Sequence, residues 1–258
     1  MPDAESSSAR SPDVERRPLG HRTPSIKSQA QVSGAGCQTS NIVVEIPVHW
    51  GRASMVDAER RLLANALLDP CNERFVLLSE SCIPLFNFTT VYSYLLGSPF
   101  SFISSFDDPR KVGRGRYRPQ MAPVVTLRDW RKGSQWFEAR RQVAAVVVSD
   151  RAIYPVFREH CRPPCYMDEH YIPTLVTKLL PWMNANRSLT WVDWSKGGSH
   201  PATVRGRHVS THFVEGLRRR RGCSYGGGST SICFLFARKF DGSTLGPLLR
   251  MATAILGF

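Results

Sequence analysis

Two adjacent carboxylates, Asp168 and Glu169, precede an apolar run in the stretch CYMDEHYIPTLVTKLLPW at residues 165–182. A carboxylate held on a rigid turn can serve as a general base. The same pair also suits the start of a helix, because Asp is a common N-cap and the helix dipole favours a negative charge in the first turn. Pro173 would then lie one turn into that helix, where its ring is costly. The residue types leave both readings open, a capped helix or a shaped turn followed by a later helix.

A second candidate is a pair of cations near the end of the chain, Arg238 and Lys239 in the stretch FLFARKFD. They directly follow an apolar run that predicts a buried strand. Cations fixed on such an element can neutralise a diphosphate, although two surface cations at a strand end would have the same pattern. The four consecutive arginines at 218–221 are typical of a solvated loop, and no nucleic-acid-binding signature accompanies them.

Further acidic residues fall at two turns. Glu80 lies between two serines after the apolar run RFVLL, and ligands gather beyond the carboxyl ends of strands in open α/β sheets. An ordinary turn is the alternative for that stretch. Asp107 and Asp108 are adjacent, rather than separated by one residue as in a nucleotide-sugar metal site, and Asp108 precedes a proline. We therefore expect no metal at this pair.

Composition limits the class of protein. The chain has 258 residues, a hydrophobic fraction of 42% and a formal net charge of +13, so it can bury a sizeable core and attract polyanions. The formal charges of residues 1–50 sum to zero, and the excess of positive charge lies in residues 51–258. No apolar run approaches the ~20 residues that span a bilayer, and the N-terminus lacks a signal-peptide pattern. The seven cysteines lack zinc-finger spacing; disulfides in a lumenal protein and reduced thiols in a cytosolic one both remain open.

The order of elements predicts an α/β layer architecture. Residues 1–40 are polar and predict disorder. Helical spacing is found at 54–70 and 89–97, in the second part of 136–150 and after residue 168. Strands are expected at 41–50, 74–81, 189–195 and 232–240, and loops at 107–120 and 196–204. The segment 216–231 is expected to be basic and flexible.

Six segments in this order resemble the plant members of the core-2/I-branching β-1,6-N-acetylglucosaminyltransferase-like proteins. They are WGRASMVDAERRLLANAL, FVLLSESCIPLFNFTTVYSYL, WRKGSQWFEARRQ, CYMDEHYIPTLV, LTWVDWSKGGSHPATV and CFLFARKF, and the likeness extends from about residue 47 to 250. The resemblance implies an α/β domain of the GT-A-like glycosyltransferase type, with a mixed central sheet flanked by helices. It also implies inverting, metal-independent transfer, with N-acetylglucosamine as the expected sugar, from a nucleotide diphosphate sugar to a glycan hydroxyl.

The resemblance also assigns roles to residues. Glu169 matches the family's general base, and Asp168 would order its turn. Lys239 matches a residue that contacts the donor diphosphate, with Arg238 and Arg221 as further candidates. The segment at 133–136 matches a stretch near the acceptor site. The residues expected to contact substrates are Ser134, Gln135, Trp136, Glu80 and Trp194. No cofactor or metal is implied, and the partners are a sugar nucleotide and a glycan or glycoprotein, not nucleic acid.

Family members begin with a cytoplasmic tail, a membrane helix and a stem, and reside in the Golgi membrane with the enzyme in the lumen. Their first strands help to bind the nucleotide. Here the likeness begins after a polar stretch, so we expect a tail at 1–45 and a catalytic domain at 46–258 that is incomplete at its N-terminus, with no visible anchor. A non-catalytic protein that keeps the fold is the alternative.

Overall fold

The computed structural model describes residues 31–33, 47–198, 200–220 and 222–258. Its α-helices are α1 (Ala53–Leu67), α2 (Phe88–Leu96), α3 (Arg141–Ser149), α4 (Ile153–His160), α5 (Tyr171–Leu179), α6 (Thr211–Arg218) and α7 (Leu245–Met251). Its strands are β1 (Gln31–Ser33), β2 (Asn72–Val76), β3 (Ile83–Pro84), β4 (Glu138–Arg140), β5 (Thr190–Val192), β6 (Cys223–Tyr225), β7 (Gly228–Thr230) and β8 (Phe236–Arg238). Strand β1 lies within the predicted 1–45 tail; the rest of that segment is outside the described residues, so the tail stays a prediction.

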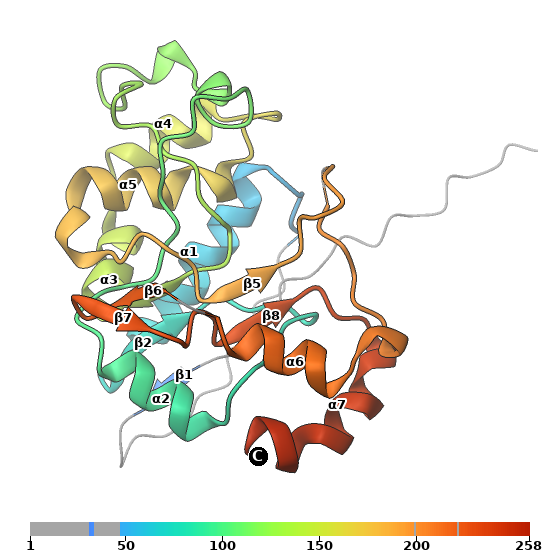
Figure 1. Ribbon diagram of the computed structural model, residues 1–258. Coiled ribbons are helices and arrows are strands. Elements are labelled where there is room, and N and C mark those ends of the chain that lie inside the picture. The colour runs from blue at the N-terminus through green and yellow to red at the C-terminus, as the bar shows by residue number, and fades with distance from the viewer. Residues whose placement is uncertain (1–30, 34–46, 199, 221) are drawn as a thin grey trace, which may run out of the picture.

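The strands form small sheets between two groups of helices (Figure 1). One sheet has the order β1-β2-β4 and is antiparallel, and another has the order β3-β8-β5, in which β5 and β8 are parallel. Helices α1, α3, α4 and α5 lie on one side of the strands in Figure 1, and α2, α6 and α7 lie on the other. This is the mixed α/β architecture, with sheets flanked by helices, that was expected.

Each group of helices encloses its own hydrophobic core, and β2 contributes to both. Phe75 and Leu77 belong to the core that contains α1, α3, α4 and α5, whereas Val76 belongs to the core beside α2 and α6. Successive side chains of a strand point to opposite faces. The apolar run RFVLL is therefore the pattern of a strand buried on both faces.

The helices at 54–70 and 89–97 are confirmed. Helix α1 ends at Leu67, ahead of the Asp69-Pro70 step that restricts its backbone. The N-cap of helix α2 is Asn87, whose side chain accepts a hydrogen bond from the Thr90 amide at 2.9 Å. The helix ends before Gly97, where a Cβ would lie 2.8 Å from the Tyr225 hydroxyl, so close approach rather than a left-handed turn requires glycine there.

The helix expected in the second part of 136–150 is confirmed as α3, which begins at Arg141 after strand β4. Other expectations on elements need correction. Strands β2 and β8 are shorter than the apolar runs that predict them. The supposedly flexible 216–231 segment forms the β6–β7 hairpin, whose turn residues Gly226 and Gly227 both have positive φ, as a tight hairpin turn requires. Of the predicted strand at 41–50, residues 41–46 lie outside the described residues and 47–50 are not in a strand.

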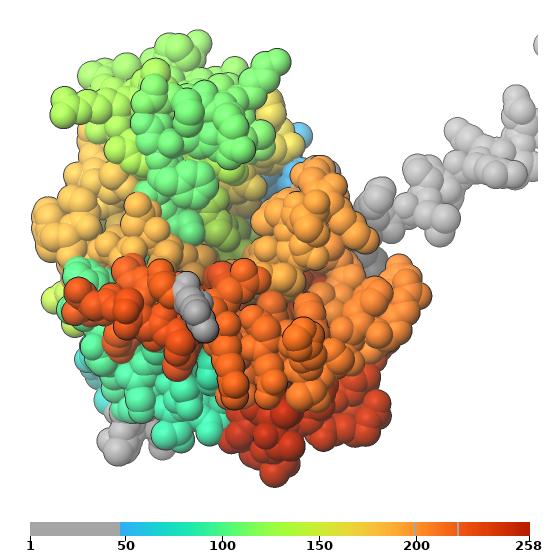
Figure 2. Space-filling model, viewed as in Figure 1, coloured from blue at the N-terminus to red at the C-terminus, as the bar shows by residue number. Residues whose placement is uncertain are grey.

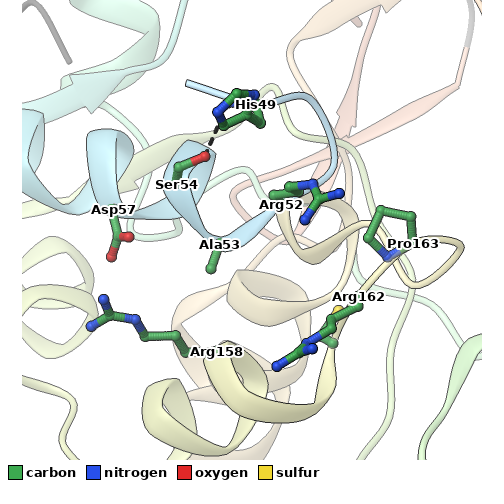
Figure 3. Close-up of a pocket in the computed structure, with 9 residues that line it drawn as sticks. His49, Arg52, Ala53, Ser54, Asp57, Arg158, Arg162 and Pro163 are labelled. Carbon is green, nitrogen blue, oxygen red and sulfur yellow. Dashed lines mark hydrogen bonds between the residues drawn. The ribbon is translucent and has the colours of Figure 1, made fainter. Parts of the chain in front are cut away.

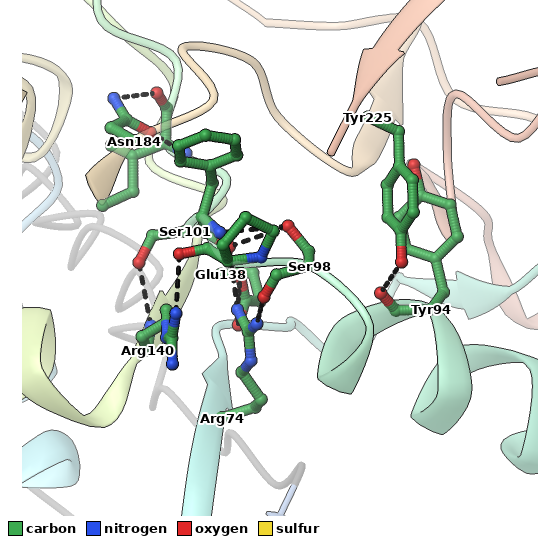
Figure 4. Close-up of polar contacts among 11 residues, drawn as sticks. Arg74, Tyr94, Ser98, Ser101, Glu138, Arg140, Asn184 and Tyr225 are labelled. Atoms are coloured by element: carbon green, nitrogen blue, oxygen red, sulfur yellow. Dashed lines mark hydrogen bonds and ion pairs between the residues drawn. The ribbon is translucent and has the colours of Figure 1, made fainter. Parts of the chain in front are cut away.

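A buried ion pair joins β2 to β4 (Figure 4). Arg74 Nη1 lies 3.1 Å from Glu138 Oε1, and both side chains are almost fully buried. The same guanidinium donates hydrogen bonds to the carbonyls of Phe100, at 2.8 Å, and Ser98. These additional acceptors compensate the desolvation that a buried pair must otherwise pay. The contacts fix the turn after α2 against the sheet.

Candidate active site

Glu169 lies at the end of a short 3-10 turn, η3 (Met167–Glu169), ahead of α5. Helix α5 begins at Tyr171, so Pro173 is its third residue, where an intrahelical partner for the amide is not needed. The residue at the N-cap of α5 is His170, not Asp168. The two acids therefore lie on a shaped turn, and the reading in which Asp168 caps the helix is wrong.

Two cations hold the Glu169 carboxylate. Arg116 Nη1 and Lys132 Nζ each lie 2.5 Å from Glu169 Oε2, and the Glu169 side chain is 24% exposed. The other oxygen, Oε1, accepts no hydrogen bond from the part of the chain that the structure describes. Burial alone would raise the pKa of Glu169, but Lys132 and Arg116 outweigh burial and lower it. The carboxylate is thus ionised, with one oxygen oriented by cations and the other available to a substrate proton.

The neighbours of Glu169 on the turn are buried. Asp168 is 6% exposed and its Oδ1 has no hydrogen-bond partner among the described residues. Burial, together with the adjacent Glu169 charge, raises the pKa of Asp168 to about 6. His170 Nδ1 lies 2.8 Å from the Arg131 carbonyl oxygen, and burial lowers the pKa of this imidazole to about 3. His170 is therefore neutral and stacks on Trp130 with ring centroids 4.4 Å apart.

A further acid, Glu59 of α1, lies near Asp168. Glu59 is 1% exposed, and burial followed by the Asp168 charge raises its pKa well above the ordinary value. Its Oε1 accepts a hydrogen bond from Gln135 Nε2 at 3.0 Å, whereas Oε2 has no partner within the described ranges. A protonated Glu59 both fixes Gln135 and avoids a second buried negative charge beside Asp168.

The segment at residues 132–136 connects these groups. The Gly133 amide donates to the Glu169 carbonyl at 2.8 Å, so this backbone is fixed against the Glu169 turn. The Ser134 hydroxyl accepts from the Trp136 amide at 3.1 Å, and Gln135 reaches Glu59. Lys132, which binds Glu169, is thus followed after Gly133 by three expected substrate contacts, Ser134, Gln135 and Trp136.

Arg238 joins the same segment from strand β8. Its guanidinium carbon lies 4.0 Å from the centroid of the Trp136 ring, a cation–π distance. Burial lowers the pKa of Arg238, and the nearby Cys82 and Glu80 oppose that shift. The structure therefore places Arg238, Trp136 and Glu80 in one neighbourhood, and their roles in substrate binding stay predictions.

Lys239 and Trp194 follow two neighbouring parallel strands. Val192 of β5 pairs with Arg238 of β8, so both strands end at the same edge of the sheet. Lys239 comes next after β8 and is half-buried, and Trp194 lies two residues after β5 with 51% of its surface exposed. Arg221, the remaining candidate for the diphosphate, lies outside the described residues.

Aromatic rings adjoin the Glu169 cations. The guanidinium of Arg116 lies 4.6 Å from the centroid of Tyr166, which in turn packs against Trp50 at 4.6 Å. Trp50 also contacts His200, at 5.4 Å between centroids, from the loop after β5. In the space-filling view, that loop (orange) projects beside residues near the start of α1 (blue) (Figure 2). Gly51 has φ of 69°, and a Cβ there would overlap the Tyr166 ring.

The two acids at 107 and 108 are each paired with an arginine. Arg114 Nε donates to Asp107 at 2.7 Å, and Arg110 Nε donates to Asp108 at 2.9 Å. The Arg110 hydrogen bond is the main reason that the pKa of Asp108 falls to about 2. Within the described residues, no group of three or more His, Cys, Asp or Glu side chains is arranged to hold a metal ion.

Sequence reasoning did not find Arg116, Lys132 or Glu59. Arg116 lies in a glycine-rich polar loop 53 residues before Glu169, and nothing in the local pattern reports that pairing. Lys132 directly precedes the GSQW segment that was expected near the acceptor, and this position could have indicated a role in the site. Glu59 has the spacing of a core position in an amphipathic helix, so a buried acid there was a detectable anomaly.

Comparison with known proteins identifies the family of the chain. The model of the Core-2/I-Branching enzyme family matches residues 21–218. A glycosyltransferase named BC10 from Oryza sativa subsp. japonica is 38% identical over 237 aligned residues, covering 76% of this chain and 58% of the rice protein. The chain thus spans less than two thirds of the length of that relative. The family match covers most of the chain and includes the Glu169 turn and the segment 132–136, so the chain belongs to the Core-2/I-Branching enzyme family.

Proposed function

We propose that this protein is an inverting glycosyltransferase that moves a sugar from a nucleotide diphosphate sugar to a glycan hydroxyl without a metal ion. The observation that carries the proposal is the Glu169 carboxylate, partly exposed, ionised and oriented by Lys132 and Arg116. The rice relative is itself named a glycosyltransferase. The family resemblance points to N-acetylglucosamine as the sugar.

Glu169 acts as the general base in this proposal. Inversion requires a base to take the proton of the acceptor hydroxyl as that oxygen attacks the anomeric carbon. Oε1 of Glu169 accepts this proton, while the two cations bound to Oε2 keep the carboxylate in position. When the proton arrives, the negative charge of Glu169 is lost and the proton later leaves to solvent.

The departing diphosphate needs positive charge in place of a metal. Lys239 and Arg238 supply it. Arg238 is the last residue of strand β8 and Lys239 follows it, so the sheet holds their backbone and little reorganisation is needed. Arg238 rests on Trp136, which restricts the guanidinium further. The commitment of Asp107 and Asp108 to arginines supports a metal-free mechanism.

A lumenal Golgi location is part of the proposal. Cys161 is bonded to Cys165 and Cys223 to Cys233, and Cys71 is disulfide-bonded as well. Disulfides form and persist in oxidising compartments such as the secretory pathway. None of the helices that the structure describes has the length and apolar character needed to cross a bilayer.

The proposal is tested by replacing the base. Glu169→Gln keeps the shape of the side chain but removes its basicity, so we expect transfer to fall by at least about 100-fold, the low end of a general base's contribution. Binding of a nucleoside diphosphate, followed by calorimetry, should stay near the wild-type level. The exposed Glu159 of α4 offers a matched control, and Glu159→Gln should retain activity. Transfer by Glu169→Gln at the wild-type rate would contradict the assignment. A wild-type chain that binds the nucleotide but transfers nothing would favour the non-catalytic alternative.

The metal-free part is tested separately. Transfer should be unchanged by excess EDTA, and added Mn²⁺ should not increase it. Strong inhibition by EDTA, reversed by Mn²⁺, would show that a divalent ion neutralises the leaving diphosphate instead of Lys239 and Arg238.

A further inference from the structure

A basic pocket that the proposed chemistry does not use lies at the start of α1 (Figure 3). Its volume is about 380 Å³, within the range of small-molecule sites. One wall is formed by His49, Arg52 and Ser54 at the start of α1. The opposite wall is formed by Arg158 of α4 and by Arg162 in the turn that follows.

The pocket carries an excess of positive charge. Its lining includes three arginines, whereas Asp57 is the only acidic residue among the lining residues, and that carboxylate accepts a hydrogen bond from the Tyr154 hydroxyl. No side-chain acceptor in the described part of the chain pairs with Arg52, Arg158 or Arg162. Three guanidinium groups around one cavity repel each other, so an anion placed between them lowers their energy.

The backbone adds to this field. Helix α1 has no side-chain N-cap bond and no acidic residue in its first turn, so its positive end is not compensated there. The Ser54 hydroxyl, which accepts from the His49 amide at 3.0 Å, is held at the rim. On the other wall, the Cys161–Cys165 disulfide holds the turn that carries Arg162. The cationic groups are therefore presented by fixed elements.

The position of the pocket relates it to the acceptor. His49 and Arg52 flank Trp50 and Gly51, which pack against Tyr166. Tyr166 in turn lies under the Arg116 guanidinium that binds Glu169. The pocket is thus connected to the candidate base by one layer of aromatic contacts.

We infer that this pocket, lined by Arg52 at the start of α1 and by Arg158 and Arg162 on the opposite wall, binds the carboxylate group of an acidic sugar in the acceptor glycan. The recognition follows from the chemistry of guanidinium groups, which match oxyanions in charge and geometry. The identification of the anion as part of the acceptor rests on the proposed glycosyl transfer, whereas the binding of an anion does not.

The experiment measures binding to the full chain without any donor, so that it is independent of catalysis. The probes are trigalacturonate, its neutral methyl ester, inorganic sulfate and inorganic phosphate. We expect trigalacturonate to bind at least tenfold more tightly than the ester, with affinity that falls as salt is added. The double variant Arg158→Gln/Arg162→Gln should lose at least tenfold in affinity. Arg151→Gln, at an exposed arginine outside the pocket, should not.

Several results would overturn the inference. Equal binding of the acid and its ester, or wild-type binding by the double variant, would remove the anion site. Binding of sulfate or phosphate without binding of trigalacturonate would remove the assignment to a sugar. Loss of nucleoside diphosphate binding in the double variant would show that the pocket holds the donor. Unchanged transfer to a neutral acceptor by the double variant would support the inference, and it separates this test from that of Glu169.

Discussion

At the scale of single residues, the electrostatics of one turn determine which acid can act. Glu169 and Asp168 are adjacent, yet the cations beside Glu169 lower its pKa while burial raises that of Asp168. One carboxylate is therefore charged and partly exposed, and the other is largely neutral below about pH 6. Such a separation of pKa values is typical of neighbouring groups with different roles.

The first prediction concerns Lys132. Replacing it with methionine removes a charge 2.5 Å from Glu169, so the pKa of the base rises. Because the base acts only when deprotonated, the acidic limb of the kcat/KM profile should move to higher pH. Lys111→Met, at an exposed lysine in the polar loop, serves as control and should leave the limb in place. An unshifted limb in the Lys132 variant would mean that Glu169 is not the titrating base.

The second prediction concerns the stability of the Asp168 turn. The folded chain keeps the Asp168 proton to about pH 6, whereas the ordinary value is 3.8, so wild type loses stability as pH rises through this window. The loss is about 3 kcal/mol for a shift of this size. Asp168→Asn has no such proton. Urea unfolding should therefore show that the free energy of unfolding of this variant, relative to wild type, increases by that amount between pH 4 and 7.

Asp129 provides a control of opposite sign. Burial opposes its ionisation, but Lys178 and Thr126 outweigh burial and lower its pKa, so its ionised form stabilises the fold as pH rises. Asp129→Asn should therefore be less stable than wild type above the ordinary carboxyl pKa of 3.8, and this deficit should shrink as the pH falls below that value. A pH-independent difference between Asp168→Asn and wild type would contradict a buried, proton-binding Asp168.

At the scale of elements, the segment 132–136 determines where the site lies. It carries Lys132 to Glu169, Gln135 to Glu59 and Trp136 to Arg238. The family resemblance predicted residues 133–136 as a stretch near the acceptor site. For Glu169 the residue types left two readings open, a capped helix or a turn before a later helix, and Pro173 was the argument for the turn. The pairing with Arg116 and Glu59 was not predictable, because these contacts depend on chain segments far apart in sequence.

The third prediction tests the position of this segment. A Cβ on Gly133 would overlap the Ser104 carbonyl oxygen and lie 2.6 Å from Pro173 Cγ. Gly133→Ala should therefore destabilise the chain by about 1–3 kcal/mol, as overpacking typically does, and it should reduce transfer as the segment shifts away from Glu169. Thermal unfolding and an activity assay measure the two effects.

Gly216 offers the matched comparison. It lies inside α6 and nothing is within 4 Å of a Cβ built there. Gly216→Ala should stabilise the chain by up to about 1 kcal/mol through helix propensity. Equal melting temperatures for the two variants would show that Gly133 does not hold the segment in place.

At the scale of the whole molecule, two hydrophobic cores on opposite sides of the strands support one site. The sequence predicted the α/β class because helical and strand-like patterns alternate along the chain. It overestimated the length of the strands, because an apolar run such as ICFLFARKF indicates burial but does not show which of its residues pair with another strand. Strand β8 has only three residues. The arginine run was also treated as solvated, whereas Arg218 lies over Phe86 and donates to the Ile255 carbonyl.

The most direct test is a crystal structure of the full chain with a bound nucleoside diphosphate. The account predicts diphosphate oxygens beside Lys239 and Arg238, with Oε1 of Glu169 on the same side of the molecule and open to an acceptor hydroxyl. A diphosphate seated between Arg52, Arg158 and Arg162, or on a face from which Glu169 is inaccessible, would contradict it.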